Sequence, residues 1–167
     1  TVKGTKDTSL QGLAIITLDS PTDVCISQRN TFFLISDTGN SRVLYVEVAT
    51  MSITKQIGDS KSPSFLSPTT MALAPSESFV LVADLDEAKS VTYIRRVDLI
   101  DFTVTTLLQT PSFITVGGMS LSPSQSYALI SDRSENVIKM LYLAKDIVTK
   151  PTYSPTRSSE DGDDDDY

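Results

Sequence analysis

The stretch FFLISDTGNSRVLYV, residues 32–46, decides the fold expected of this chain. An apolar run ends at Asp37, a short polar segment follows, and a second apolar run begins directly after it. Two β-prone runs joined by a segment that contains Asp, Gly and Asn are typical of a β-hairpin. We therefore expect one strand over residues 32–36, a second over 42–48 and a turn between them.

The same hairpin pattern occurs three times in the chain. Asp84 and Asp132 also end apolar runs, in the sequences LVAD and LISD, and the three aspartates are 47 and 48 residues apart. The distance along the chain to each aspartate from Pro21, Pro68 and Val116 is a constant 16 residues. Constant units joined by loops of variable length indicate one repeated supersecondary structure.

Each copy contains four β-prone segments. They cover residues 23–27, 32–36, 42–48 and 52–57, then 70–74, 79–83, 90–99 and 103–108, then 118–122, 127–131, 136–143 and a weaker 146–149. Four antiparallel strands in about 47 residues correspond to one blade of a β-propeller. We predict an all-β fold, a partial β-propeller with three four-stranded antiparallel blades over about 20–60, 67–110 and 115–150. The second segment of each copy is nearly all apolar, so these strands should be buried on both faces.

Several motifs within the copies resemble the NHL repeat. The first copy begins with PTDV at residue 21 and continues as LISDTGNSRV, which is similar to the start and the hairpin of that repeat. The sequences RRVDLIDFTVTTL, from residue 95, and SPSQSYALISDRSENVI, from residue 122, are similar to its outer and inner halves. The resemblance spans residues 20–150 and implies a propeller. It implies no particular activity, because NHL propellers include enzymes, RNA binders and scaffolds.

Negative charge is concentrated near the end of the chain. The net charge is −7, and residues 157–166 hold six acids and one base, which leaves residues 1–150 nearly neutral. A phosphate-backbone partner requires a basic face, so nucleic-acid binding is not expected. No apolar run approaches about 18 residues, so membrane insertion is not expected either. Residues 151–167 are predicted to be a Pro- and Ser-rich linker followed by an acidic, disordered tail.

The repeated aspartates are the main candidates for a functional site. An aspartate at the entry of a hairpin accepts hydrogen bonds from backbone N–H groups of the turn, and repetition favours this structural role for Asp37, Asp84 and Asp132. Gly39 and Asn40 are expected to supply positive φ angles in the first turn. The alternative is that channel carboxylates serve a Ca²⁺-dependent hydrolase of the lactonase type.

Other groups that could carry catalysis are scarce. The chain has no His and a single cysteine, Cys25, whose apolar neighbours predict a buried small side chain. The enzymes implied by the NHL resemblance depend on His, the usual general base near neutral pH. We therefore predict that the protein is not an enzyme and that it uses no cofactor or metal.

Three blades are too few to close a ring, because closed propellers have about four to eight. The outermost blades should expose apolar faces of the kind that mark interfaces. Either the chain is part of a longer protein, or copies of it associate into a dimer or a filament. The segment TVKGT, residues 1–5, resembles an outer strand that could pair with another chain.

These features together predict a structural or interaction module whose partners are copies of itself. About a quarter of the residues are Ser or Thr, which suits an extracellular or cell-surface protein that carries glycans. The candidate O-glycosylation sites are Ser62, Ser67, Ser154 and Thr156.

Overall fold

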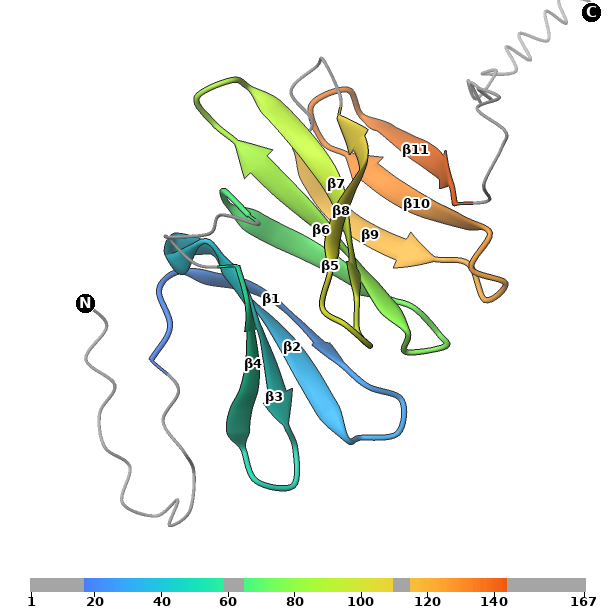
Figure 1. Ribbon diagram of the computed structural model, residues 1–167. Coiled ribbons are helices and arrows are strands. Elements are labelled where there is room, and N and C mark those ends of the chain that lie inside the picture. Colours follow the sequence, from blue (N-terminus) through green and yellow to red (C-terminus); the bar gives the residue numbers. More distant parts are fainter. Residues whose placement is uncertain (1–16, 59–64, 110–114, 144–167) are drawn as a thin grey trace, which may run out of the picture.

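The computed structural model describes residues 17–58, 65–109 and 115–143 of the chain (Figure 1). Their strands form three antiparallel sheets, which we call blades 1, 2 and 3. Blade 1 consists of β1 (Pro21–Ile26), β2 (Phe32–Asp37), β3 (Arg42–Glu47) and β4 (Ser52–Ile57). Blade 2 consists of β5 (Pro68–Leu73), β6 (Phe79–Asp86), β7 (Val91–Asp98) and β8 (Val104–Gln109). Blade 3 consists of β9 (Val116–Leu121), β10 (Tyr127–Asp132) and β11 (Val137–Tyr142).

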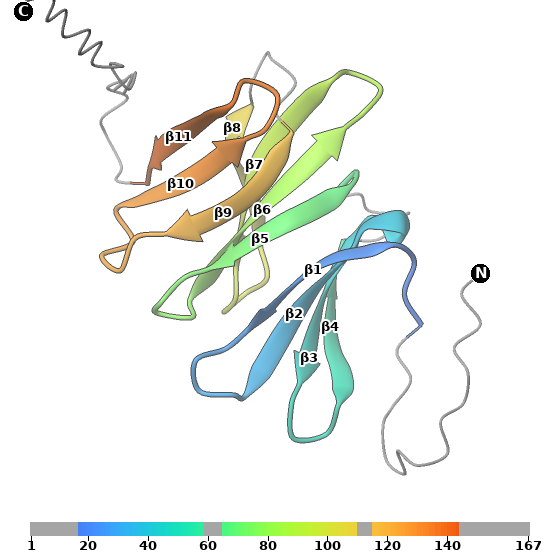
Figure 2. The ribbon, with the colours of Figure 1, turned by 180° about the vertical axis from the view of Figure 1, so that it is seen from behind.

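The blades follow one another in chain order. Their first strands β1, β5 and β9 lie side by side, and the later strands of each blade fan outward from them (Figure 1 and Figure 2). This is how neighbouring blades are arranged in a β-propeller. The prediction of an all-β, partial propeller is confirmed. The fourth strand expected over residues 146–149 lies outside the described residues, which also contain no helix long and apolar enough to span a membrane.

Strand register explains the constant spacing of 16 residues. In blade 1 Pro21 is paired with Asp37, and in blade 2 Pro68 is paired with Asp84. In blade 3 the residue opposite Asp132 is Val116. Each of these pairs is followed or preceded by a register shift. The repeat length is therefore the length of chain that runs along the first strand and back to the aspartate.

The hydrophobic core lies in layers between successive blades. Phe32, Leu34 and Val43 of blade 1 pack with Val80 and Val82 of blade 2. On the other face of blade 2, Phe79, Leu81 and Ala83 belong to clusters that include Ala128 and Ile130 of blade 3. Burial of apolar surface between sheets stabilises this stack, as it does in any β-protein with packed sheets.

The burial of the second strands was predicted correctly for β2 and β6 but not for β10. Leu34 and Leu81 are fully buried, whereas Leu129 at the corresponding position is 39% exposed. The difference arises because no blade in the described part of the chain covers this face of blade 3. An apolar strand sequence reports what a strand could bury, and the neighbouring blade decides whether it does.

The prediction of positive φ angles at Gly39 and Asn40 was wrong. Residues 38–40 form a 3-10 turn, and the residue with left-handed backbone is Ser41, with φ of 54°. Gly39 is instead required by a close approach, since a Cβ there would lie 2.5 Å from Cγ of Asp19. The amide of Gly39 also donates to the Asp19 carbonyl at 2.9 Å.

Candidate functional site: the repeated aspartates and the open faces

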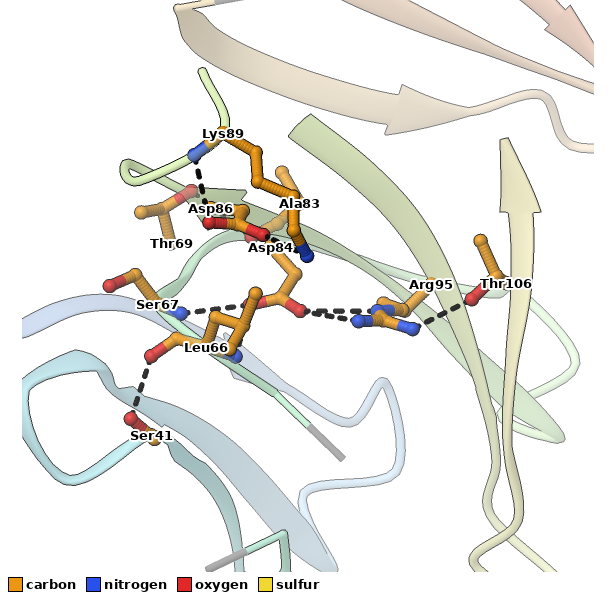
Figure 3. Close-up of polar contacts among 10 residues, drawn as sticks. All are labelled: Ser41, Leu66, Ser67, Thr69, Ala83, Asp84, Asp86, Lys89, Arg95 and Thr106. Atoms are coloured by element: carbon orange, nitrogen blue, oxygen red, sulfur yellow. Dashed lines mark hydrogen bonds and ion pairs between the residues drawn. The ribbon is translucent and has the colours of Figure 1, made fainter. Parts of the chain in front are cut away.

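The repeated aspartates are buried and held by hydrogen bonds, as Asp84 illustrates in Figure 3. Oδ1 of Asp84 accepts from the backbone N–H groups of Leu66 at 2.8 Å and Ser67 at 2.9 Å. Oδ2 accepts from Arg95 Nε at 3.1 Å and lies 3.0 Å from its Nη2. Arg95 also donates from Nη1 to Thr106 Oγ1 at 2.7 Å, so it connects β7 to β8. Burial nevertheless raises the pKa of Asp84, because desolvation outweighs these favourable contacts.

Asp37 makes the corresponding contacts in blade 1. Its Oδ1 accepts from the backbone N–H of Asp19 at 2.7 Å, and its Oδ2 accepts from Asn40 Nδ2 at 2.9 Å and Arg42 Nε at 2.6 Å. The backbone donors of Asp37 and Asp84 therefore belong to the segments that precede β1 and β5, not to the hairpin turns. These aspartates fasten the entry of each blade to its third strand.

Asp132 makes turn contacts of the kind that the sequence predicts for all three aspartates. Its Oδ1 accepts from the N–H groups of Ser134 at 3.0 Å and Glu135 at 3.3 Å, and its Oδ2 lies 2.8 Å from Nζ of Lys139. Burial of Asp132 opposes ionisation. Hydrogen bonds from Lys139, Ser134 and Glu135 outweigh that effect and lower the pKa of Asp132 to about 2.

Acidification should weaken the native state through Asp132. Because the folded pKa is about 2 and the usual aspartate value is 3.8, the carboxylate stabilises the fold above pH 3.8. That contribution should disappear as the pH falls from about 4 toward about 2. Urea unfolding of the wild type and Asp132→Asn should therefore differ most at neutral pH and converge toward pH 2. A difference that is independent of pH would contradict the prediction.

The three aspartates do not come together as a shared carboxylate site. Each has its own cation, Arg42, Arg95 or Lys139, within its own blade. Among residues 17–58, 65–109 and 115–143, no three His, Cys, Asp or Glu side chains form a group that could hold a metal ion.

Cys25 faces the layer between blades 1 and 2. It packs against the cluster that contains Leu34 and Val82. Burial, with a smaller contribution from the Asp23 carboxylate, raises the pKa of the Cys25 thiol to about 11. A thiol with so high a pKa is protonated near neutral pH and is a poor nucleophile.

Each blade has two faces, which we name by their direction along the chain. The leading face turns toward the following blade and the trailing face toward the preceding one. In blade 1 the leading face carries Phe32, Leu34 and Ser36, and in blade 2 it carries Phe79, Leu81 and Ala83. The trailing faces of blades 2 and 3 carry Val80 with Val82 and Ala128 with Ile130.

Two of these faces have no blade against them in the described part of the chain. The leading face of blade 3 carries Leu129 on β10 and Ile138, Met140 and Tyr142 on β11, all of which are exposed. The trailing face of blade 1 carries Phe33 and Ile35 and the exposed Val24, Ile26 and Ile53. Contiguous exposed apolar side chains mark interaction sites, so these open faces form the candidate functional site.

Sequence reasoning predicted exposed apolar faces at the ends of the segment but did not assign residues to them. The signal was present in VIKMLY of β11, whose alternate side chains fall on opposite faces. Of the candidate glycosylation sites, Ser67 is half-buried and its amide donates to Asp84. Ser62, Ser154 and Thr156 lie outside the described residues, as does the segment 1–5.

No family model matches the sequence, and no curated protein matches it significantly. Solved structures do resemble the fold. The chain aligns over 80% of its length with hydrazine synthase from Kuenenia stuttgartiensis at 18% identity and a TM-score of 0.60. It aligns over 75% with a chain of a nidogen/laminin complex at 13% identity and a TM-score of 0.62. A provisionally named 6-phosphogluconolactonase from Bacteroides fragilis aligns over 77% at 16% identity and a TM-score of 0.56.

These likenesses identify the class of the protein as a β-propeller. The alignments cover 36%, 45% and 36% of the three solved chains, so this chain spans less than half of the length of each. At such low identity the likeness concerns the fold alone. The solved structures therefore agree with a segment of a propeller whose end blades remain open.

Proposed function

We propose that this protein is a non-catalytic interaction module of the NHL type that self-associates through the open leading face of blade 3 and the open trailing face of blade 1. The observation that carries the proposal is that these two faces are complementary in kind. Inside the chain, a leading face packs on a trailing face twice, between blades 1 and 2 and between blades 2 and 3. The open pair repeats that combination.

The energetics favour an assembly in which both faces of each chain are covered. Seven exposed side chains would become buried at each new interface, which corresponds to about 5–10 kcal/mol. Association costs about 4–15 kcal/mol in lost freedom of motion. One interface therefore only roughly offsets the cost, whereas two interfaces formed by the same pair of chains would exceed it.

The described residues offer little support for the alternative, a Ca²⁺-dependent hydrolase of the lactonase type. The first strands β1, β5 and β9 contribute one acid, Asp23. Its carboxylate is already engaged, since Oδ2 accepts from the backbone N–H of Met71 at 2.6 Å. We propose an extracellular or cell-surface setting on the basis of the Ser- and Thr-rich sequence, with glycans as additional surface groups.

Charges placed on the open faces should abolish association. Ile138→Glu on blade 3 and Ile26→Glu on blade 1 each put a carboxylate where an apolar partner must pack, and a buried unpaired charge is strongly unfavourable. Light scattering at micromolar concentration should show assembly of the wild type and monomers of both variants. Ile100→Glu is the matched control, because Ile100 is 81% exposed in the turn between β7 and β8 and should leave assembly unchanged.

A folded wild-type monomer at micromolar concentration would overturn self-association. The occupant of the open faces would then be a different sequence. Loss of assembly in Ile100→Glu to the same degree as in Ile138→Glu would show that the open faces have no special role.

A further inference from the structure

We infer that two copies of the chain form a closed ring, in which the leading face of blade 3 packs on the trailing face of blade 1 of the other copy in the register used between blades 1 and 2. This inference rests on the proposed function and adds the partner, the register and the closure. Three observations carry it: a serine near the ring centre, a polar pair at the outer turns and the apolar side chains between them.

The first observation concerns the serine before the repeated aspartate. Ser36 Oγ lies 3.3 Å from the Asp23 carbonyl of its own blade and 2.7 Å from the Thr69 carbonyl of blade 2. Ser131 occupies the same position in blade 3, and its Oγ lies 3.3 Å from the Gly118 carbonyl, which corresponds to that of Asp23. Its contact within the blade is thus already in place. The carbonyl that corresponds to Thr69 in a following blade 1 is that of Thr22.

The second observation concerns the turns between the first and second strands. Between blades 1 and 2, the amide of Arg29 donates to Glu77 Oε1 at 3.2 Å. Between blades 2 and 3, Ser76 Oγ donates to Gln125 Oε1 at 2.7 Å. The position of Glu77 and Gln125 has positive φ in every blade, and in blade 1 it is occupied by Asn30.

This turn contact can be continued beyond blade 3. The residue that corresponds to Ser76 is Ser124, and Ser124 Oγ lies 2.7 Å from Ser126 Oγ, just as Ser76 Oγ lies 2.7 Å from Ser78 Oγ. Both Ser124 and Asn30 are exposed. A hydroxyl and a side-chain amide would therefore face each other across the new interface, as they do between Ser76 and Gln125.

The third observation is the matching of apolar side chains. Each leading face presents an aromatic residue followed two positions later by leucine, as in Phe32 with Leu34, Phe79 with Leu81 and Tyr127 with Leu129. Each trailing face presents two apolar residues at the next positions along the same strands, as in Val80 with Val82, Ala128 with Ile130 and Phe33 with Ile35. The open faces thus carry the same kinds of side chain as the faces that already pack.

Closure follows from the number of blades and from the direction of the contact. A leading face meets a trailing face, so the contact is head-to-tail and either closes or continues indefinitely. Three blades from each of two copies give six, which lies within the range of about four to eight found in closed rings. A closed pair covers both open faces of both copies, whereas a continuing series always leaves one face open at each end.

Cross-linking of engineered cysteines tests the register. Ser124→Cys and Asn30→Cys, made in separate chains and mixed, should be joined by a short bis-maleimide into a two-chain product. Ser76→Cys with Gln125→Cys in one chain calibrates the reach of the reagent, because that pair is adjacent in the structure. Ser124→Cys mixed with Thr50→Cys is the matched negative control, since Thr50 lies in the turn between β3 and β4. Wild type reports any reaction of Cys25.

The outcomes separate this inference from the proposed function. Assembly in light scattering together with the Ser124–Asn30 product supports the register. Assembly without that product, or with equal linking to position 50, overturns the register and leaves self-association intact. Absence of assembly overturns both. A chain carrying both Ser124→Cys and Asn30→Cys should stop at two linked chains, and a ladder of longer products would overturn closure.

Discussion

Arg95→Met should lower the free energy of unfolding by about 3–5 kcal/mol, because it removes the cation that faces a buried carboxylate. Asp84 is fully buried, and the Arg95 side chain is only 19% exposed. Methionine keeps most of the apolar stem of arginine, so the loss reports the missing guanidinium contacts with Asp84 and Thr106. Urea unfolding at pH 7 measures the change directly.

The pH dependence of this variant identifies the cause. Burial already raises the pKa of Asp84, and removal of Arg95 should raise it further. A carboxyl group with a raised folded pKa destabilises the fold when it is ionised and ceases to do so when it is protonated. The deficit of Arg95→Met relative to the wild type should therefore shrink as the pH is lowered from 7 to 5.

Arg29→Met is the matched control for Arg95→Met. Arg29 also lies near an acid, but it is 78% exposed and its Nε is 3.7 Å from Glu77 Oε2. An exposed pair at that distance contributes about 0–1 kcal/mol, so this substitution should change stability little. Equal effects of the two substitutions would show that the Asp84–Arg95 pair is not a structural tie. Addition of Asp84→Asn to Arg95→Met should recover part of the loss, because no buried charge then remains unpaired.

Phe65→Ala should cost about 3–5 kcal/mol, as expected for the truncation of a fully buried aromatic side chain. Phe65 is 0% exposed although it lies in the segment between β4 and β5, outside any strand. It belongs to the cluster that joins blades 1 and 2, so its loss leaves a cavity in the layer that holds them together. Thermal or urea unfolding of the variant should show the full effect.

The adjacent residue provides the control for Phe65. Leu66 is 40% exposed, and its contacts with Asp84 and Ser41 use its backbone N–H and carbonyl, which alanine retains. Leu66→Ala should therefore cost about 1 kcal/mol or less. A Phe65→Ala variant no less stable than Leu66→Ala would mean that the connecting segment does not contribute to the core.

The repeated hairpins could be predicted from the sequence because their signals are local. An apolar run that ends in aspartate and is followed by a turn specifies its own structure, and the 16-residue spacing reflects strand register directly. Phe65 could not be predicted as a core residue, since a single aromatic among serines and prolines has no periodicity. Its burial depends on two blades that meet around it.

The partners of the repeated aspartates were hidden for a related reason. Arg42 follows the first hairpin directly and is paired with Asp37 in the strand register. In blade 2 the hairpin is longer and Asp84 is opposite Tyr93, so its cation, Arg95, lies two residues further along β7. Lys139 is likewise two residues beyond Val137, which is opposite Asp132. No fixed sequence offset reveals these pairs, because loop length and register together place the cation.

The polar contacts of this propeller segment differ according to whether they lie inside a blade or between blades. Inside each blade, a buried aspartate is paired with a cation. Between blades 1 and 2, the buried polar contacts are largely neutral, with hydroxyl groups of Thr38 and Ser41 donating to backbone carbonyls. Salt screens interactions between charges far more than it affects neutral hydrogen bonds and apolar packing. Ionic strength and acidity therefore act on the integrity of single blades, whereas the joints between blades, and any joint between copies built in the same way, are largely independent of the ionic environment.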